Sequence, residues 1–111
     1  MDFDEFRKHF RLGDWRQENE YRRECDRLIV LHAIEAGVPV ENLIRYWRVA
    51  ARYCDMSYHD RANFKQRIYY VRRVANFWHL LDIEEQEQFR SGAILPYRAA
   101  SVVTKRLSSK G

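Results

Sequence analysis

Basic side chains crowd the middle of the chain, where acidic partners are almost absent. Between Leu43 and Leu80 there are 8 lysines and arginines but only 2 acidic residues, Asp55 and Asp60. A solvated helix edge usually mixes the two signs, because opposite charges three or four positions apart stabilise a helix. The excess of one sign therefore favours a surface for a negatively charged partner over an ordinary solvated edge.

These residues fall at helical spacing on two predicted helices. Arginine can pair with guanine or phosphate, asparagine with adenine, and lysine with phosphate. The pattern thus predicts a face that binds double-stranded DNA. Three of its members lie at i, i+3 and i+7 on one helix, and the others lie on the next helix: Arg45, Arg48, Arg52, Arg61, Lys65, Tyr69, Arg72, Arg73 and Asn76.

A second interpretation of the same face stays open. Tyrosine, tryptophan and arginine also carry most of the energy of protein–protein interfaces. A non-catalytic module that binds an acidic protein surface, such as an adaptor or an inhibitor of a nucleic-acid enzyme, would have this composition. Duplex binding at two salt concentrations separates the two interpretations.

Motifs for catalysis, cofactors and metals are not found. The chain has no H-E-x-x-H, no phosphate-binding loop and no dinucleotide fingerprint. Cys25 and Cys54 lack the C-x-x-C spacing of a zinc ribbon and are expected to be free, buried thiols. His32 lies on an apolar face, where a core histidine is commoner than a ligand. We expect no enzyme, no metal and no cofactor.

Length and composition predict one helical domain. The 111 residues include 46% hydrophobic residues, 4 glycines and only 2 prolines, which leaves little material for hairpins. The net charge of +4 is uneven, because residues 1–41 carry −3 and residues 42–111 carry +7. No segment approaches the roughly 18 apolar residues of a membrane span, and the charged N-terminus is not a signal peptide. A soluble, cytoplasmic protein is expected.

The first three predicted helices follow from apolar spacing and stop signals. Three phenylalanines on a short first helix that ends at Gly13 suggest a homodimer that would cover them: Phe3, Phe6 and Phe10. A second helix runs from Asp14 or Gln17 to Ala36 and ends at Gly37. A third runs from about Glu41 to Cys54, with an apolar inner face: Leu43, Ile44, Trp47, Ala50, Ala51 and Cys54.

The fourth helix is predicted to be the central one. It begins at the capping pattern of Ser57 and Asp60 and runs to about Leu81. Two adjacent apolar rows make its buried stripe unusually wide: Phe64, Ile68, Val71, Ala75 and Trp78, and Tyr70, Val74, Phe77 and Leu81. Trp78 is expected to be buried, and the Arg72 side is expected to be an outward working surface.

Two shorter helices complete the prediction. Asp82 and Glu85 form a second capping box, which starts a helix that runs to Arg90 before Gly92. A last helix starts at Pro96 and runs to about Leu107. The fold class is all-α, a compact bundle of five or six helices. It forms a single domain over residues 1–107, and residues 108–111 are a flexible tail.

One stretch resembles a known family. The segment "YVRRVANFWHLLDIEEQEQFRSGAILPYRAASVV" (residues 70–103) is similar to the DNA-binding core of ParB-type partition proteins and KorB-like repressors. In those proteins a recognition helix leads into a Leu-Leu segment, an acidic helix, a glycine turn and a further helix. The resemblance implies a DNA-binding regulator, such as a plasmid or phage encodes. It also implies a helix-turn-helix-like unit, for which residues 49–64 are the candidate segment.

Overall fold

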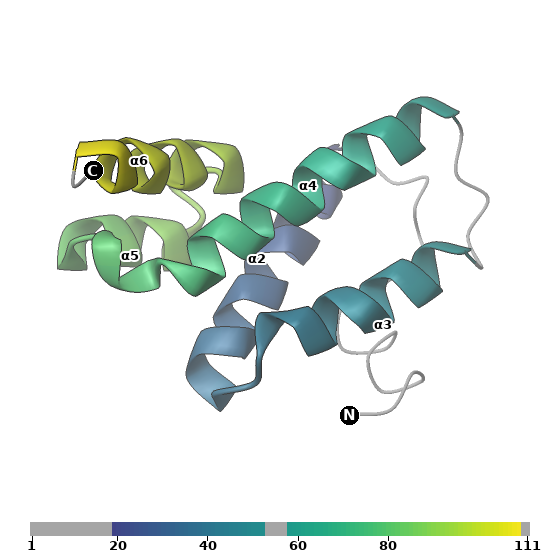
Figure 1. Ribbon diagram of the computed structural model, residues 1–111, viewed down its shortest axis with the longest axis horizontal. Helices are drawn as coiled ribbons and strands as arrows, with labels where there is room; N and C mark the ends of the chain where they lie inside the picture. Colours follow the sequence, from purple (N-terminus) through teal and green to yellow (C-terminus); the bar gives the residue numbers. More distant parts are fainter. Residues whose placement is uncertain (1–18, 53–57, 110–111) are drawn as a thin grey trace.

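Helices make up the described part of the chain (Figure 1). The computed structural model describes residues 19–52 and 58–109, with side chains in 26–49 and 64–109. The helices are α2 (Asn19–Ala36), α3 (Val40–Arg52), α4 (Tyr58–Asn76), α5 (Ile83–Ser91) and α6 (Pro96–Ser109), with a short 3₁₀ turn η1 (Trp78–Leu80). These ranges contain no strand, so the predicted all-α bundle is confirmed.

The link between α2 and α3 follows the predicted stop signals. Gly37 has a φ of +65°, a conformation that glycine adopts without strain. Pro39 cannot continue a helix, but its carbonyl accepts a hydrogen bond from the Asn42 N–H at 3.0 Å as α3 begins. The apolar face of α3 is buried as predicted at Leu43, Ile44 and Trp47.

Helix α4 is the central element of the bundle, as predicted. It packs against α2, α3 and α6, and α2 passes behind it in Figure 1. Its buried side chains are those of Phe64, Ile68, Val71 and Val74. The Trp47 ring of α3 meets the Phe64 ring edge-on, with ring centroids 4.8 Å apart.

Helix α4 ends earlier than predicted, at Asn76 instead of about Leu81. Phe77 leaves the helical conformation, and after η1 the backbone is extended at Leu81. This bend turns the chain back so that α5 and α6 can cover the bundle, and it places Leu81 in the core. The Gln86 side chain donates to the carbonyls of Trp78 and Leu81, each at 3.2 Å.

The bend also corrects the expected burial of Trp78. Trp78 begins η1 and is only half-buried. Its ring packs edge-on against the fully buried Phe89, with centroids 5.5 Å apart, and the Arg90 guanidinium lies over it at 5.5 Å. The fully buried tryptophan of the described chain is Trp47.

Helix α5 has the predicted ends. Asp82 accepts a hydrogen bond from the Glu85 N–H at 2.8 Å, and the Glu85 carboxylate accepts one from the Asp82 N–H at 2.9 Å. This capping box satisfies two N–H groups that the helix leaves without partners. Gly92, with a φ of +83°, ends the helix, and α6 begins at Pro96. Helix α6 runs to Ser109, so the first two residues of the predicted tail, Ser108 and Ser109, are helical.

Several predictions lie outside the described residues. They concern the first helix with its phenylalanines, the Ser57 cap, and the side chains of Cys25 and Cys54. The turn that would join the two helices of the helix-turn-helix-like unit also falls there, within residues 53–57.

In the described ranges, no helix is both long and apolar enough to cross a lipid bilayer.

Candidate nucleic-acid interface

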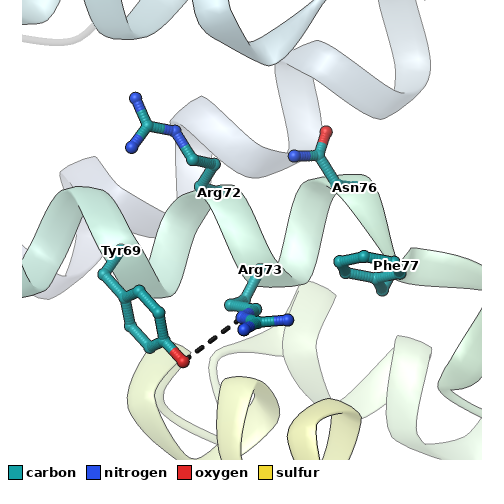
Figure 2. Close-up of a pocket in the computed structure, with 5 residues that line it drawn as sticks. All are labelled: Tyr69, Arg72, Arg73, Asn76 and Phe77. Carbon is teal, nitrogen blue, oxygen red and sulfur yellow. Dashed lines mark hydrogen bonds between the residues drawn. The ribbon is translucent and has the colours of Figure 1, made fainter. Parts of the chain in front are cut away.

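Seven of the nine predicted interface side chains can be placed, since those of Arg52 and Arg61 are outside the described set. Four of the seven line one shallow pocket of about 250 Å³ on α4, together with Phe77: Tyr69, Arg72, Arg73 and Asn76. Figure 2 shows that Arg72 and Asn76 project to one side of the helix, while Tyr69, Arg73 and Phe77 project to the other. The predicted face of α4 is therefore made of two rows.

Arg45, Arg48 and Lys65 point into solvent on α3 and α4. The opposite face of α3 is buried through Leu43 and Trp47, which leaves the arginines on the outside. Among the described residues, none of the three cations forms an ion pair with a carboxylate. They remain available to an external anion.

Arg72 differs from the prediction, because an acidic residue of α3 neutralises it. Its Nε and Nη2 donate to the two Glu41 carboxylate oxygens at 2.5 and 3.0 Å. The hydrogen bond from Arg72 holds the pKa of Glu41 below its ordinary value. Arg72 and Glu41 are 36% and 54% exposed, so the pair adds little stability. Its main effect is to remove one positive charge from the surface.

Arg73 is held between two aromatic rings of its own helix. Its guanidinium carbon lies 5.3 Å from the centroid of Tyr69 and 5.8 Å from that of Phe77. Its Nε also donates to the Tyr69 hydroxyl at 3.2 Å (Figure 2). The i, i+4 spacing of these residues places the three side chains in one row. The stacking orients the guanidinium without neutralising it, since neither ring carries a negative charge.

Arg67 is the basic residue of this region that turns inward. Its Nη2 lies 2.7 Å from a carboxylate oxygen of Asp26 on α2, and its Nε lies 3.1 Å from both oxygens. Its guanidinium also lies 5.2 Å from the Trp47 ring centroid. Burial raises the pKa of Asp26, although the charge and hydrogen bonds of Arg67 oppose the shift. The sequence carried a signal for this role, because Arg67 stands between Phe64 and Val71 on the buried side of α4.

Helix α6 carries further exposed cations, which the sequence analysis did not single out. Its Arg98 and Lys105 are exposed, and no residue of α6 is acidic. Tyr97 is 47% exposed, and its ring centroid lies 6.4 Å from that of Tyr70 on α4. The signal that could have found these cations is that residues 96–109 contain no Asp or Glu. This segment lies outside residues 43–80, where the charge excess was first noted.

Other kinds of site find no support in the described part of the chain. No three His, Cys, Asp or Glu side chains come together there in a group that could hold a metal ion. His32 is half-buried on α2, and His79 is exposed on η1. Comparison of the chain with protein-family models, with curated proteins and with solved structures gives no match.

Proposed function

We propose that this chain is a small, non-catalytic DNA-binding protein of the cytoplasm. Its contact surface is the α3–α4 basic face, defined as Arg45, Arg48 and Lys65. The observation that carries the proposal is that none of these three cations forms an ion pair with a carboxylate among the described residues. The similarity of residues 70–103 to ParB-type and KorB-like proteins supports the same class of partner.

The geometry of the two helices supports a continuous face. Glu41, Arg45 and Arg48 lie at i, i+4 and i+7, so they share one side of α3. Lys65 and Arg72 lie at i and i+7 and share one side of α4. Because Glu41 binds Arg72, these two sides meet at that ion pair. A polyanion lying along the junction would contact cations from both helices.

Phosphate contacts would supply most of the affinity, and Asn76 would contact a base. Each neutralised phosphate of B-DNA contributes about −0.9 to the slope of log affinity against log salt. Asn76 is exposed at the pocket, and an asparagine amide can donate to and accept from an adenine edge. The proposal therefore predicts strongly salt-dependent binding with modest sequence preference.

The first test measures duplex binding over a salt series. Arg48→Gln is expected to flatten the slope by about one, because it removes one phosphate contact. Arg90→Gln is the control, since it removes another exposed arginine, which lies on α5 outside this face, and should leave the slope unchanged. If the wild-type protein binds no duplex even at low salt, the proposal fails. The α3–α4 basic face then becomes the first candidate site for binding an acidic surface of a partner protein.

A gain of function provides the second test. Glu41→Gln removes the charge that neutralises Arg72, so it should free one more cation for phosphate. We expect tighter duplex binding and a slope steeper by about one. The double variant Glu41→Gln with Arg72→Gln should return to the wild-type slope. Unchanged binding by Glu41→Gln would show that Arg72 lies outside the contact surface.

A further inference from the structure

Two exposed tyrosines lie on neighbouring helices. Among the described residues only three large hydrophobic side chains are exposed: Tyr69 at 45%, Tyr97 at 47% and Ile83 at 78%. Tyr70 links the two tyrosines, with its ring centroid 5.8 Å from that of Tyr69 and 6.4 Å from that of Tyr97. Tyr69, Tyr70 and Tyr97 are the tyrosine row, which bridges α4 and α6.

Each exposed ring has an arginine beside it. Arg73 stacks on Tyr69, and the Arg98 Nε lies 3.5 Å from the Tyr97 hydroxyl. No acidic residue occurs in α6, and none is present among the described side chains of α4. The surroundings of the row therefore favour a partner that combines negative charge with flat, apolar faces. A nucleic-acid strand has both, in its phosphates and its bases.

We propose that the tyrosine row stacks unpaired bases of a DNA strand while Arg73 and Arg98 contact its phosphates. Inside a duplex each base is covered on both faces by its neighbours, so a protein ring stacks there only at the cost of unstacking, whereas an unpaired base offers an open face. Base–aromatic stacking tolerates any sequence, because every base has a π-face. The preferred ligand is thus a duplex that continues into a single-stranded segment. This proposal rests on the proposed function, since the α3–α4 basic face supplies the duplex contact.

The test compares three fluorescently labelled probes at one salt concentration. They are a blunt duplex of about 20 base pairs, the same duplex with an overhang of about six thymidines, and one with an equally long abasic overhang. The abasic probe has the phosphates of the overhang without its bases, so it controls for charge. We expect the wild-type protein to bind the thymidine overhang about 5- to 100-fold more tightly than the abasic overhang.

Variants of Tyr97 assign this preference to the ring. Tyr97→Phe keeps an aromatic face and should keep the preference, while Tyr97→Leu keeps apolar bulk without a π-face and should lose most of it. Tyr97 is the sharper position, because Tyr69 also orients Arg73. Circular dichroism and the salt slope on blunt duplex should be the same for both variants, which separates stacking from folding and from charge.

The two proposals fail in different ways. Equal binding of the thymidine and abasic overhangs by the wild-type protein would overturn the stacking proposal and leave DNA binding intact. A preference that survives in Tyr97→Leu would also overturn it. No binding of any probe at low salt would overturn the proposed function itself, and the stacking proposal with it.

Discussion

Replacing Arg67 with methionine tests the inward ion pair that joins α2 to α4. Methionine keeps an unbranched apolar side chain against Trp47 and Phe64 but removes the guanidinium. The Asp26 carboxylate, which is 6% exposed, would then lose the only ion pair it makes within the described residues. Breaking a buried pair from one side typically costs about 3–5 kcal/mol, because a charge remains buried without compensation.

The protonation of Asp26 gives a separate bound on this cost. Protonating a carboxyl group whose unfolded pKa is about 3.9 costs about 4 kcal/mol of free energy at pH 7, because each pH unit above the pKa adds about 1.36 kcal/mol. The folded variant can always escape by taking up a proton, so its loss at pH 7 should not greatly exceed this figure. The two arguments agree on a loss of about 3–4 kcal/mol.

The expected loss depends on pH with a definite sign. Burial raises the pKa of Asp26 in the folded protein, and loss of Arg67 should raise it further. The folded variant therefore binds a proton at a higher pH than the unfolded chain, and its stability rises as the pH falls through the raised pKa. Near pH 4 about half of the unfolded chains also carry this proton, so the deficit relative to wild type should shrink to below about 1 kcal/mol.

Urea unfolding followed by circular dichroism at pH 7 and near pH 4 measures both deficits. A double variant, Arg67→Met with Asp26→Leu, is the control, because replacing a buried pair by apolar residues is often neutral or stabilising. It should recover most of the loss at pH 7. A deficit that is the same at both pH values, or a double variant as unstable as Arg67→Met, would refute the assignment of the loss to an uncompensated carboxylate.

Three further predictions concern stability. Trp47→Ala should cost about 3–5 kcal/mol in chemical denaturation, and Trp78→Ala should cost clearly less, because only the Trp47 ring is fully buried; equal losses would contradict the burial difference. Gly92→Ala should cost about 1–2 kcal/mol through its positive φ, with the thermal midpoint as the measurement. Hydrogen bonding from Arg106 holds the pKa of Glu85 below 4.5, so this contribution is present above pH 4.5 and is lost as the pH falls through the lowered pKa. Glu85→Gln should therefore flatten the fall of stability in acid, by less than about 1 kcal/mol for a partly exposed pair, and an unchanged acid profile would count against it.

Local chemistry made the ends of most described helices predictable. Gly37, Asp82, Gly92 and Pro96 each act within one or two turns of chain, through a positive φ, a capping hydrogen bond or a missing N–H. The end of α4 has no such signal, because Asn76 is followed by residues that could continue a helix. Packing of α5 and α6 decides the bend there, and this depends on segments that lie later in the chain.

The candidate interface was harder to predict than the fold. Helical spacing correctly places Arg45, Arg48 and Lys65 in solvent. Spacing within one helix could not reveal that Arg72 meets Glu41, since their hydrogen bonds join positions 31 residues apart. The charge of Arg67 alone does not distinguish it from the exposed arginines, because its partner Asp26 is 41 residues away on α2.

Helix α4 packs both against helices that follow it in the chain and against α2, which lies far before it. This arrangement affects the order in which the contacts form during folding. Helices α2 and α3 follow each other directly, and so do the elements from α4 to α6, so each group can form with little loop-closure entropy. Helix α3 also packs on α4, but the Asp26–Arg67 contact of α2 with α4 joins residues 41 positions apart. We expect the Asp26–Arg67 pair to close late on the folding pathway, so that Arg67→Met speeds unfolding far more than it slows folding.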